Sequence, residues 1–219
     1  MSDHEHPHHH HFLPAMGHPA LTPFYDSFAR LVAREKTFKG RLVERLGLRA
    51  GSRVLDVGCG TGTLAIMIAS ARDGVEVTAV DGDPEILERA RAKANAAGAS
   101  IDFRQAMATE LPFADGTFDR VTSTLMAHHL PTTDKQQMFA QIRRVLAPAG
   151  ELHLVDVGPA LSAIGRSAQR LLRPNVLIDN LDGKLPSLMS AAGLADIVEE
   201  DRVVTVLGPL VFWRAQRPR

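Results

Sequence analysis

Apolar and polar positions along this chain follow two different periods in turn. Short runs rich in Val, Leu and Ile, typical of buried strands, alternate with longer segments in which apolar residues recur at helical spacing. The pattern predicts strands at 53–57, 75–80, 100–104, 118–123 and 151–157, with helices at about 62–71, 84–97 and 132–147. Such alternation indicates parallel strands joined by right-handed crossovers, so the expected fold class is an α/β doubly wound sheet.

The two ends of the chain depart from this alternation. An apolar stripe at helical spacing over 24–46 predicts an N-terminal helix, or two short ones, that ends before Gly47 and Gly51. Residues 195–216 instead contain two strand-like segments joined at Gly208-Pro209. They predict a terminal hairpin in place of another crossover.

Residues 1–20 are unlike the rest of the chain. Seven of the ten histidines lie there, among prolines and acidic residues and without helical or strand periodicity, which predicts a flexible segment ahead of one domain over 21–219. Two interpretations of the histidines stay open. Clustered imidazoles can bind zinc, nickel or copper, whereas a solvated tail or a partial purification tag needs no metal.

Composition narrows the function classes. Lys plus Arg and Asp plus Glu number 25 each, so no overall positive field favours a nucleic-acid partner. The single cysteine, Cys59, excludes a disulfide framework and a cysteine-built metal site, which indicates a cytoplasmic protein. We expect no membrane span, because no apolar run approaches the roughly 18 residues that one needs.

The strongest chemical signal is the glycine turn in "RVLDVGCGTGTLAI", residues 53–66. A dinucleotide fingerprint has Gly or Ala where this chain has Thr63, and a phosphate-binding loop needs a lysine after Gly62. The turn instead follows Asp56, and a carboxylate there suits a ligand that carries an ammonium group. Asp81 ends the next strand, about 20 residues on, where a carboxylate accepts hydrogen bonds from both ribose hydroxyls. Together they indicate a nucleoside with a cationic amino-acid tail.

Four blocks, "VLDVGCGTG", "VTAVDGDPEIL", "ATELPFADGTFDRV" and "LMAHHL", followed by "QIRRVLAPAGELHLVD", occur in this order. With these blocks the chain resembles the class I S-adenosylmethionine-dependent methyltransferases, and in particular their quinone-methyltransferase-like (type 11) branch, over roughly residues 24–157. The resemblance implies a Rossmann-like sheet of seven strands, mostly parallel, with an antiparallel strand from the C-terminal hairpin. It also implies S-adenosylmethionine as the cofactor and S-adenosylhomocysteine as its product.

The resemblance assigns roles to individual residues. Asp56 and the backbone of the glycine turn would hold the methionine portion, and Asp81 the ribose. Where the family usually has an Asp for the adenine amino group, this chain has Met107, which leaves a thioether and apolar packing. The expected cofactor-binding residues are Asp56, Gly58, Cys59, Gly60, Gly62, Asp81, Gly82, Met107, Ala108 and Ser123. The adjacent His128 and His129 are candidate catalytic bases, because imidazole titrates near neutrality.

The methyl acceptor is expected to be a small apolar or aromatic molecule, with a quinone precursor as the specific candidate. The base-methylating members of the superfamily commonly have [DN]-P-P-[YF] where this chain reads "TSTLMAHH", and arsenic methylation needs several thiolates. An acceptor lid is expected over about 158–183, and Arg166, Arg170 and Arg173 form a basic stripe within it. Two alternatives remain: an NAD-dependent oxidoreductase, and a metal-binding protein that uses the His-rich segment on a non-catalytic cofactor domain.

Overall fold

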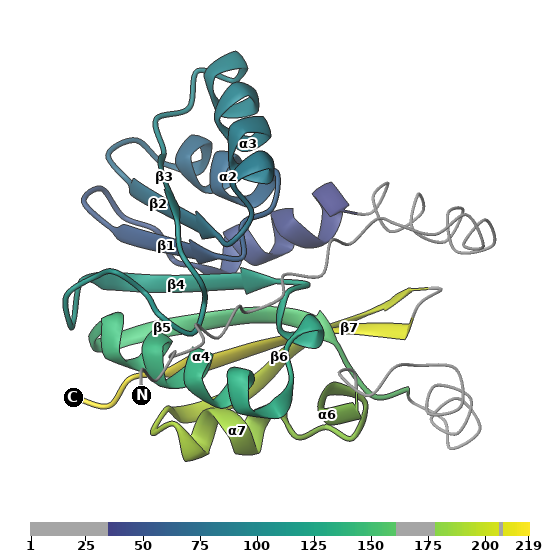
Figure 1. Cartoon of the computed structure of the whole chain (residues 1–219). Coiled ribbons are helices and arrows are strands. Elements are labelled where there is room, and N and C mark those ends of the chain that lie inside the picture. Colours follow the sequence, from purple (N-terminus) through teal and green to yellow (C-terminus); the bar gives the residue numbers. More distant parts are fainter. Residues whose placement is uncertain (1–34, 161–177, 206–207) are drawn as a thin grey trace, which may run out of the picture.

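A seven-stranded sheet forms the centre of the protein (Figure 1). The computed structural model describes residues 35–160, 178–205 and 208–219, and the structural statements below concern these residues. The strand order is β3-β2-β1-β4-β5-β7-β6. The strands are β1 (Arg53–Val57), β2 (Glu76–Asp81), β3 (Asp102–Gln105), β4 (Phe118–Thr124), β5 (Leu146–Val157), β6 (Ala195–Thr205) and β7 (Gly208–Gln216).

Strand direction confirms the expected topology. β3, β2, β1, β4 and β5 pair in parallel, whereas β7 is antiparallel to both of its neighbours, β5 and β6. β7 is therefore the one reversed strand in the described sheet. The two antiparallel strands that the sequence pattern predicts at the C-terminus are present, with β6 at the sheet edge. The predicted junction at Gly208-Pro209 is wrong, because both residues belong to β7, where Gly208 pairs with Thr205 and Pro209 with Val204.

Helices cover both faces of the sheet (Figure 1). A helix over residues 35–45, together with α2 (Thr63–Ala71) and α3 (Pro84–Ala96), packs on one apolar cluster. The helices α4 (Thr132–Val145) and α7 (Leu185–Ala191) pack on a second cluster. Along β5, Leu152 and Leu154 belong to the second cluster, and Val155 and Val157 belong to the first. This alternation shows that β5 is buried on both faces, as expected for a central strand.

The start of α3 follows from local sequence. Asp83 is the N-cap, and its Oδ1 accepts from the backbone N of Glu85 at 2.9 Å and of Ile86 at 3.3 Å. Pro84 lies in the first turn, where a backbone N–H has no acceptor within the helix, so the lack of this group in proline costs no helical hydrogen bond. Gly98, with φ of +66°, follows the helix as predicted.

Several boundaries differ from the sequence prediction, and the largest difference is where α4 meets β5. β5 begins at Leu146 and α4 ends at Val145, so the strand takes in residues assigned to the helix or to a turn. The physical reason is Pro148, which disfavours helical backbone at the residue before it. The short helices α6 (Ile178–Leu181) and α7 were not anticipated. The expected helix over 24–46 is described from residue 35 onward.

Parts of other predictions lie outside the described residues. These are the His-rich segment 1–20, residues 161–177 of the expected lid, and the basic stripe of Arg166, Arg170 and Arg173. Within the described chain, the helices are too short or too polar to cross a lipid bilayer.

Candidate functional site

The glycine turn joins the carboxyl end of β1 to α2 and bends toward β2. The backbone N of Gly58 and of Cys59 both donate to the carbonyl of Val80, at 2.9 and 3.0 Å. Gly58 and Gly60 have φ of +70° and +54°, a region that side chains with a Cβ rarely adopt. A Cβ on Gly60 would meet no atom of the described residues within 4 Å, so among these residues the backbone is open to the approach of a ligand.

Asp81 fastens this turn to the start of α3. Its Oδ2 accepts from the backbone N of Gly60 at 2.9 Å, and its Oδ1 accepts from the backbone N of Asp83 at 3.1 Å. An ionised carboxylate offers about four lone-pair positions, so each oxygen keeps acceptor capacity for a hydroxyl. The structure thus brings the two predicted acidic residues, Asp56 and Asp81, to the carboxyl ends of two adjacent parallel strands, β1 and β2.

Asp56 is a buried carboxylate with an unused oxygen. Its residue is 1% exposed, and its Oδ1 accepts from the Thr122 hydroxyl at 2.9 Å. Its Oδ2 is buried and has no hydrogen-bond partner among the described residues. Burial raises the pKa of this carboxyl from 3.8 to about 6, against the opposing effects of Lys39 and Thr122. A buried carboxylate oxygen without a donor fits an incoming ammonium group, which would satisfy it.

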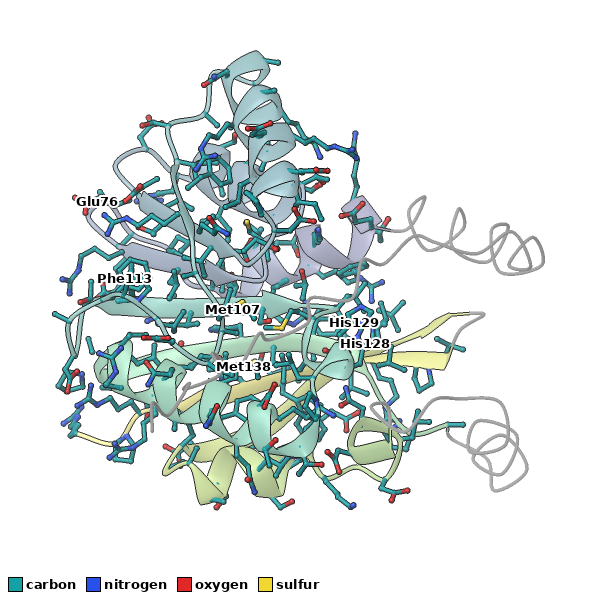
Figure 2. The ribbon with its side chains drawn as sticks, viewed as in Figure 1. Glu76, Met107, Phe113, His128, His129 and Met138 are labelled. Atoms are coloured by element: carbon teal, nitrogen blue, oxygen red, sulfur yellow. The ribbon has the colours of Figure 1, made fainter. Side chains whose placement is uncertain are left out.

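The expected adenine side of the site is apolar. Met107, on the segment that leads from β3 toward β4, is 49% exposed and is labelled in Figure 2. A Cβ on Gly82 would lie 2.9 Å from its sulfur, so the thioether rests on the Gly82 backbone. Ala108 packs against the neighbouring apolar cluster. An exposed thioether beside a bare glycine offers a surface for a flat ring.

Three other predicted cofactor residues have structural contacts of their own. The Cys59 thiol is buried in the apolar cluster, and burial raises its pKa, so it is not a thiolate. A Cβ on Gly62 would lie only 3.1 Å from the Phe103 ring, so close packing against this ring accounts for a glycine at this position. The Ser123 hydroxyl donates to the Val57 carbonyl at 2.9 Å within the sheet. Contact of these residues with a cofactor stays a prediction.

The two histidines follow β4 on the short helix η2 (Ala127–His129), at the same end of the sheet (Figure 2). His128 Nδ1 lies 2.7 Å from Oδ1 of Asp156, and the His128 backbone N donates to Oδ2 of the same carboxylate at 3.2 Å. Asp156 lies in β5 and is fully buried. A buried carboxylate on Nδ1 fixes the tautomer in which Nε2 is free to accept a proton.

His129 has a different environment. Its ring centroid lies 4.0 Å from that of His128. Desolvation, followed by the charge of His128, lowers the pKa of His129 to about 4, although the residue is exposed at the surface. At neutral pH His129 is therefore uncharged. The two histidines therefore differ in environment, although the sequence alone does not distinguish them. Among the described contacts, only His128 has a carboxylate partner.

Sequence reasoning missed two residues of this region, Asp156 and Lys39. The signal for Asp156 was a carboxylate inside the apolar strand "LHLVDV". The signal for Lys39 was a charged residue between Phe38 and Leu42 in an apolar helical stripe. Both are buried, and charged side chains are almost never buried unless they are paired. No group of three His, Cys, Asp or Glu residues suited to a metal ion occurs in the described part of the chain.

The raised pKa of Asp56 leads to a prediction for the protein without ligand. Because folding raises this pKa, Asp56 contributes most to stability below pH 4 and loses that contribution as pH rises through 6. Asp56→Asn removes the buried charge, so we expect its free energy of unfolding at pH 8 to exceed that of the wild type by roughly 2–3 kcal/mol. Thermal melts from pH 4 to 8 check this, and a gap between the two proteins that does not close at low pH would refute it.

Comparison with known proteins finds relatives in both sequence and fold. Residues 54–150 match a family model described as a methyltransferase domain. The chain is 36% identical over 141 residues to a demethylmenaquinone methyltransferase of Thermus thermophilus, covering 64% of this chain and 63% of that protein. It is 37% identical over 150 residues to a 27-O-demethylrifamycin SV methyltransferase of Amycolatopsis mediterranei, covering 67% of this chain and 54% of that protein.

A solved S-adenosylmethionine-dependent methyltransferase from Methanosarcina mazei superposes with a TM-score of 0.66 at 19% identity, covering 81% of this chain and 97% of that chain. This likeness supports the fold. The chain spans less than two thirds of the length of the two curated relatives above. None of these similarities supports the oxidoreductase or the metal-binding alternative.

Proposed function

Because this chain belongs to the class I S-adenosylmethionine-dependent methyltransferases, we propose that it transfers a methyl group from S-adenosylmethionine to a small acceptor molecule. The observation that carries the proposal is the Oδ2 of buried Asp56, which has no hydrogen-bond partner among the described residues and lies next to a glycine turn that is itself bonded to Asp81. A ligand without a hydrogen-bond donor would leave that oxygen unsatisfied, whereas an amino-acid ammonium group supplies both a donor and the opposite charge.

The residues present fit this cofactor. Asp56 would hold its ammonium group, Asp81 its ribose hydroxyls, and Met107 with Gly82 its adenine ring. When bound, S-adenosylmethionine supplies an electrophilic methyl group on a sulfonium sulfur. The protein has to align the acceptor with that methyl group and to exclude water, since most of the rate enhancement in such a displacement comes from positioning.

We further propose that the acceptor loses a proton on methylation and that His128 receives it. Asp156 keeps the Nδ1 proton on His128 and stabilises the imidazolium that forms when Nε2 accepts a second proton. Acceptors of this kind are phenols, enols and hydroxyl groups. The relatives named for demethylmenaquinone and for a rifamycin support a small apolar or aromatic acceptor, with a quinone precursor as the specific candidate.

Composition supports a proposal for the kind of partner and for the cellular location. Equal numbers of basic and acidic residues support a small molecule over a nucleic acid as the partner. The cytoplasm is the proposed location, supported by the single, buried Cys59.

An acceptor screen tests the proposal. Full-length protein with S-adenosylmethionine is incubated with hydroxylated quinones, simple phenols, aliphatic alcohols and duplex DNA, and S-adenosylhomocysteine is quantified. We expect turnover above the acceptor-free rate with a hydroxylated aromatic compound and none with DNA. Turnover with DNA alone would contradict the small-molecule assignment.

A further inference from the structure

The helix over residues 35–45 is fixed against the glycine turn. Phe38, Leu42 and Leu46 are at most 1% exposed and belong to the same apolar cluster as Cys59 of the turn and Leu64 of α2. These buried contacts, two from the helix itself and one from Leu46 directly after it, hold the helix in a defined position relative to the turn. The helix lies outside the residues that the methyltransferase domain model matches.

Lys39 is a buried cation on this helix. The residue is 7% exposed, and its Nζ donates to Oε1 of Glu35, one helical turn earlier, at 2.5 Å. The Glu35 side chain is 29% exposed and so reaches solvent. This bond uses one of the three N–H groups of the ammonium. The pairing holds the Lys39 side chain in place, and within the described part of the chain it leaves N–H donors for a second anionic partner.

Packing places Lys39 beside the turn, because it is buried on the helix whose Phe38 and Leu42 share the apolar cluster of Cys59, and electrostatics agrees. The charge of Lys39 lowers the pKa of the Asp56 carboxyl and of the Cys59 thiol, in both cases against a larger effect of burial. Despite this neighbour, the Oδ2 of Asp56 accepts no hydrogen bond from the residues that the structure describes. One buried carboxylate and one buried ammonium group, each with unused hydrogen-bonding capacity, therefore lie close to the same turn.

We propose that Lys39 binds the carboxylate of the amino-acid tail of S-adenosylmethionine while Asp56 binds the ammonium group of the same tail. The two protein charges match the two charges of the zwitterion, and each would pair with its opposite. This inference rests on the proposed function, because it concerns the same cofactor. It makes Lys39 a binding residue, whereas a purely structural lysine would serve only as the counter-ion of Asp56.

Two ligands that differ only at the carboxylate separate these roles. Isothermal titration is carried out with S-adenosylmethionine and with decarboxylated S-adenosylmethionine, on the full chain and on Lys39→Met. We expect the substitution to weaken S-adenosylmethionine binding by about 10- to 100-fold, as for a lost hydrogen bond to a charged group, and to change binding of the decarboxylated ligand by about twofold or less. Lys36→Met, at an exposed lysine on the same helix, is the matched control and should change neither affinity.

Each other outcome has a defined meaning. Equal weakening of both ligands would overturn the inference, because it would show that Lys39 acts only through Asp56. Absence of binding of either ligand to the folded wild-type protein would contradict the proposed function itself. If Lys39→Met does not fold, Lys39→Gln, which is neutral and polar, replaces it with the same expected loss of the preference for the carboxylate.

Discussion

His128→Asn should lower kcat for a hydroxyl acceptor by about 10²- to 10⁴-fold, the usual contribution of a general base. The asparagine amide can still donate to Asp156, which would otherwise be a buried carboxylate without its 2.7 Å partner. The variant therefore removes the base while it keeps the local fold. The measurement is the single-turnover rate of S-adenosylhomocysteine formation with the best acceptor from the screen.

His129→Asn is the matched control for this experiment. The pKa of His129 is lowered to about 4, which makes it a poor proton acceptor at neutral pH, so the rate should fall by about tenfold or less. In both variants the Kd for S-adenosylmethionine should stay within about twofold of the wild type, since neither histidine is assigned to the cofactor. An unchanged rate in His128→Asn would exclude His128 as the base and would favour an acceptor that needs no proton removal.

Asp81→Ala should weaken binding of both S-adenosylmethionine and S-adenosylhomocysteine by at least about tenfold, or about 1.5 kcal/mol. The carboxylate is expected to accept from two ribose hydroxyls, and it already positions the backbone of Gly60 and Asp83 at 2.9 and 3.1 Å. Both ligands share the ribose, so the two losses should be equal. Isothermal titration measures both.

The neighbouring Asp83 provides the control for Asp81. Asp83 caps α3 through Glu85 and Ile86, so Asp83→Ala should reduce the free energy of unfolding by about 1 kcal/mol without a matching loss of affinity. If Asp83→Ala weakens cofactor binding as much as Asp81→Ala does, the loss belongs to the start of α3, and Asp81 is not the ribose ligand.

Helices and strands could be predicted from the sequence where capping residues, prolines or glycines define their ends. β1 was predicted at its observed bounds, and Asp83-Pro84 and Gly98 marked the two ends of α3. The junction of α4 and β5 could not be predicted in the same way, because Pro148 moves the boundary by several residues. Helices as short as α6 contain too few residues to show a period.

The candidate site could be predicted from the sequence only where its residues lie in one motif. Asp56, Asp81 and the glycine turn are separated by fixed spacing along a single strand-helix-strand unit. The contact between His128 and Asp156 depends instead on the parallel register of two strands, in which Thr124 of β4 pairs with Val155 of β5. Lys39 comes from a helix that only tertiary packing brings to the turn. Such contacts leave no spacing in the sequence to detect.

Isothermal titration of the full chain with S-adenosylmethionine, S-adenosylhomocysteine and NADH tests directly which cofactor the protein binds. We expect one-to-one binding of the first two ligands and no binding of NADH at the same concentration. Folded protein that binds neither S-adenosylmethionine nor S-adenosylhomocysteine would show that the protein is not a methyltransferase of this kind.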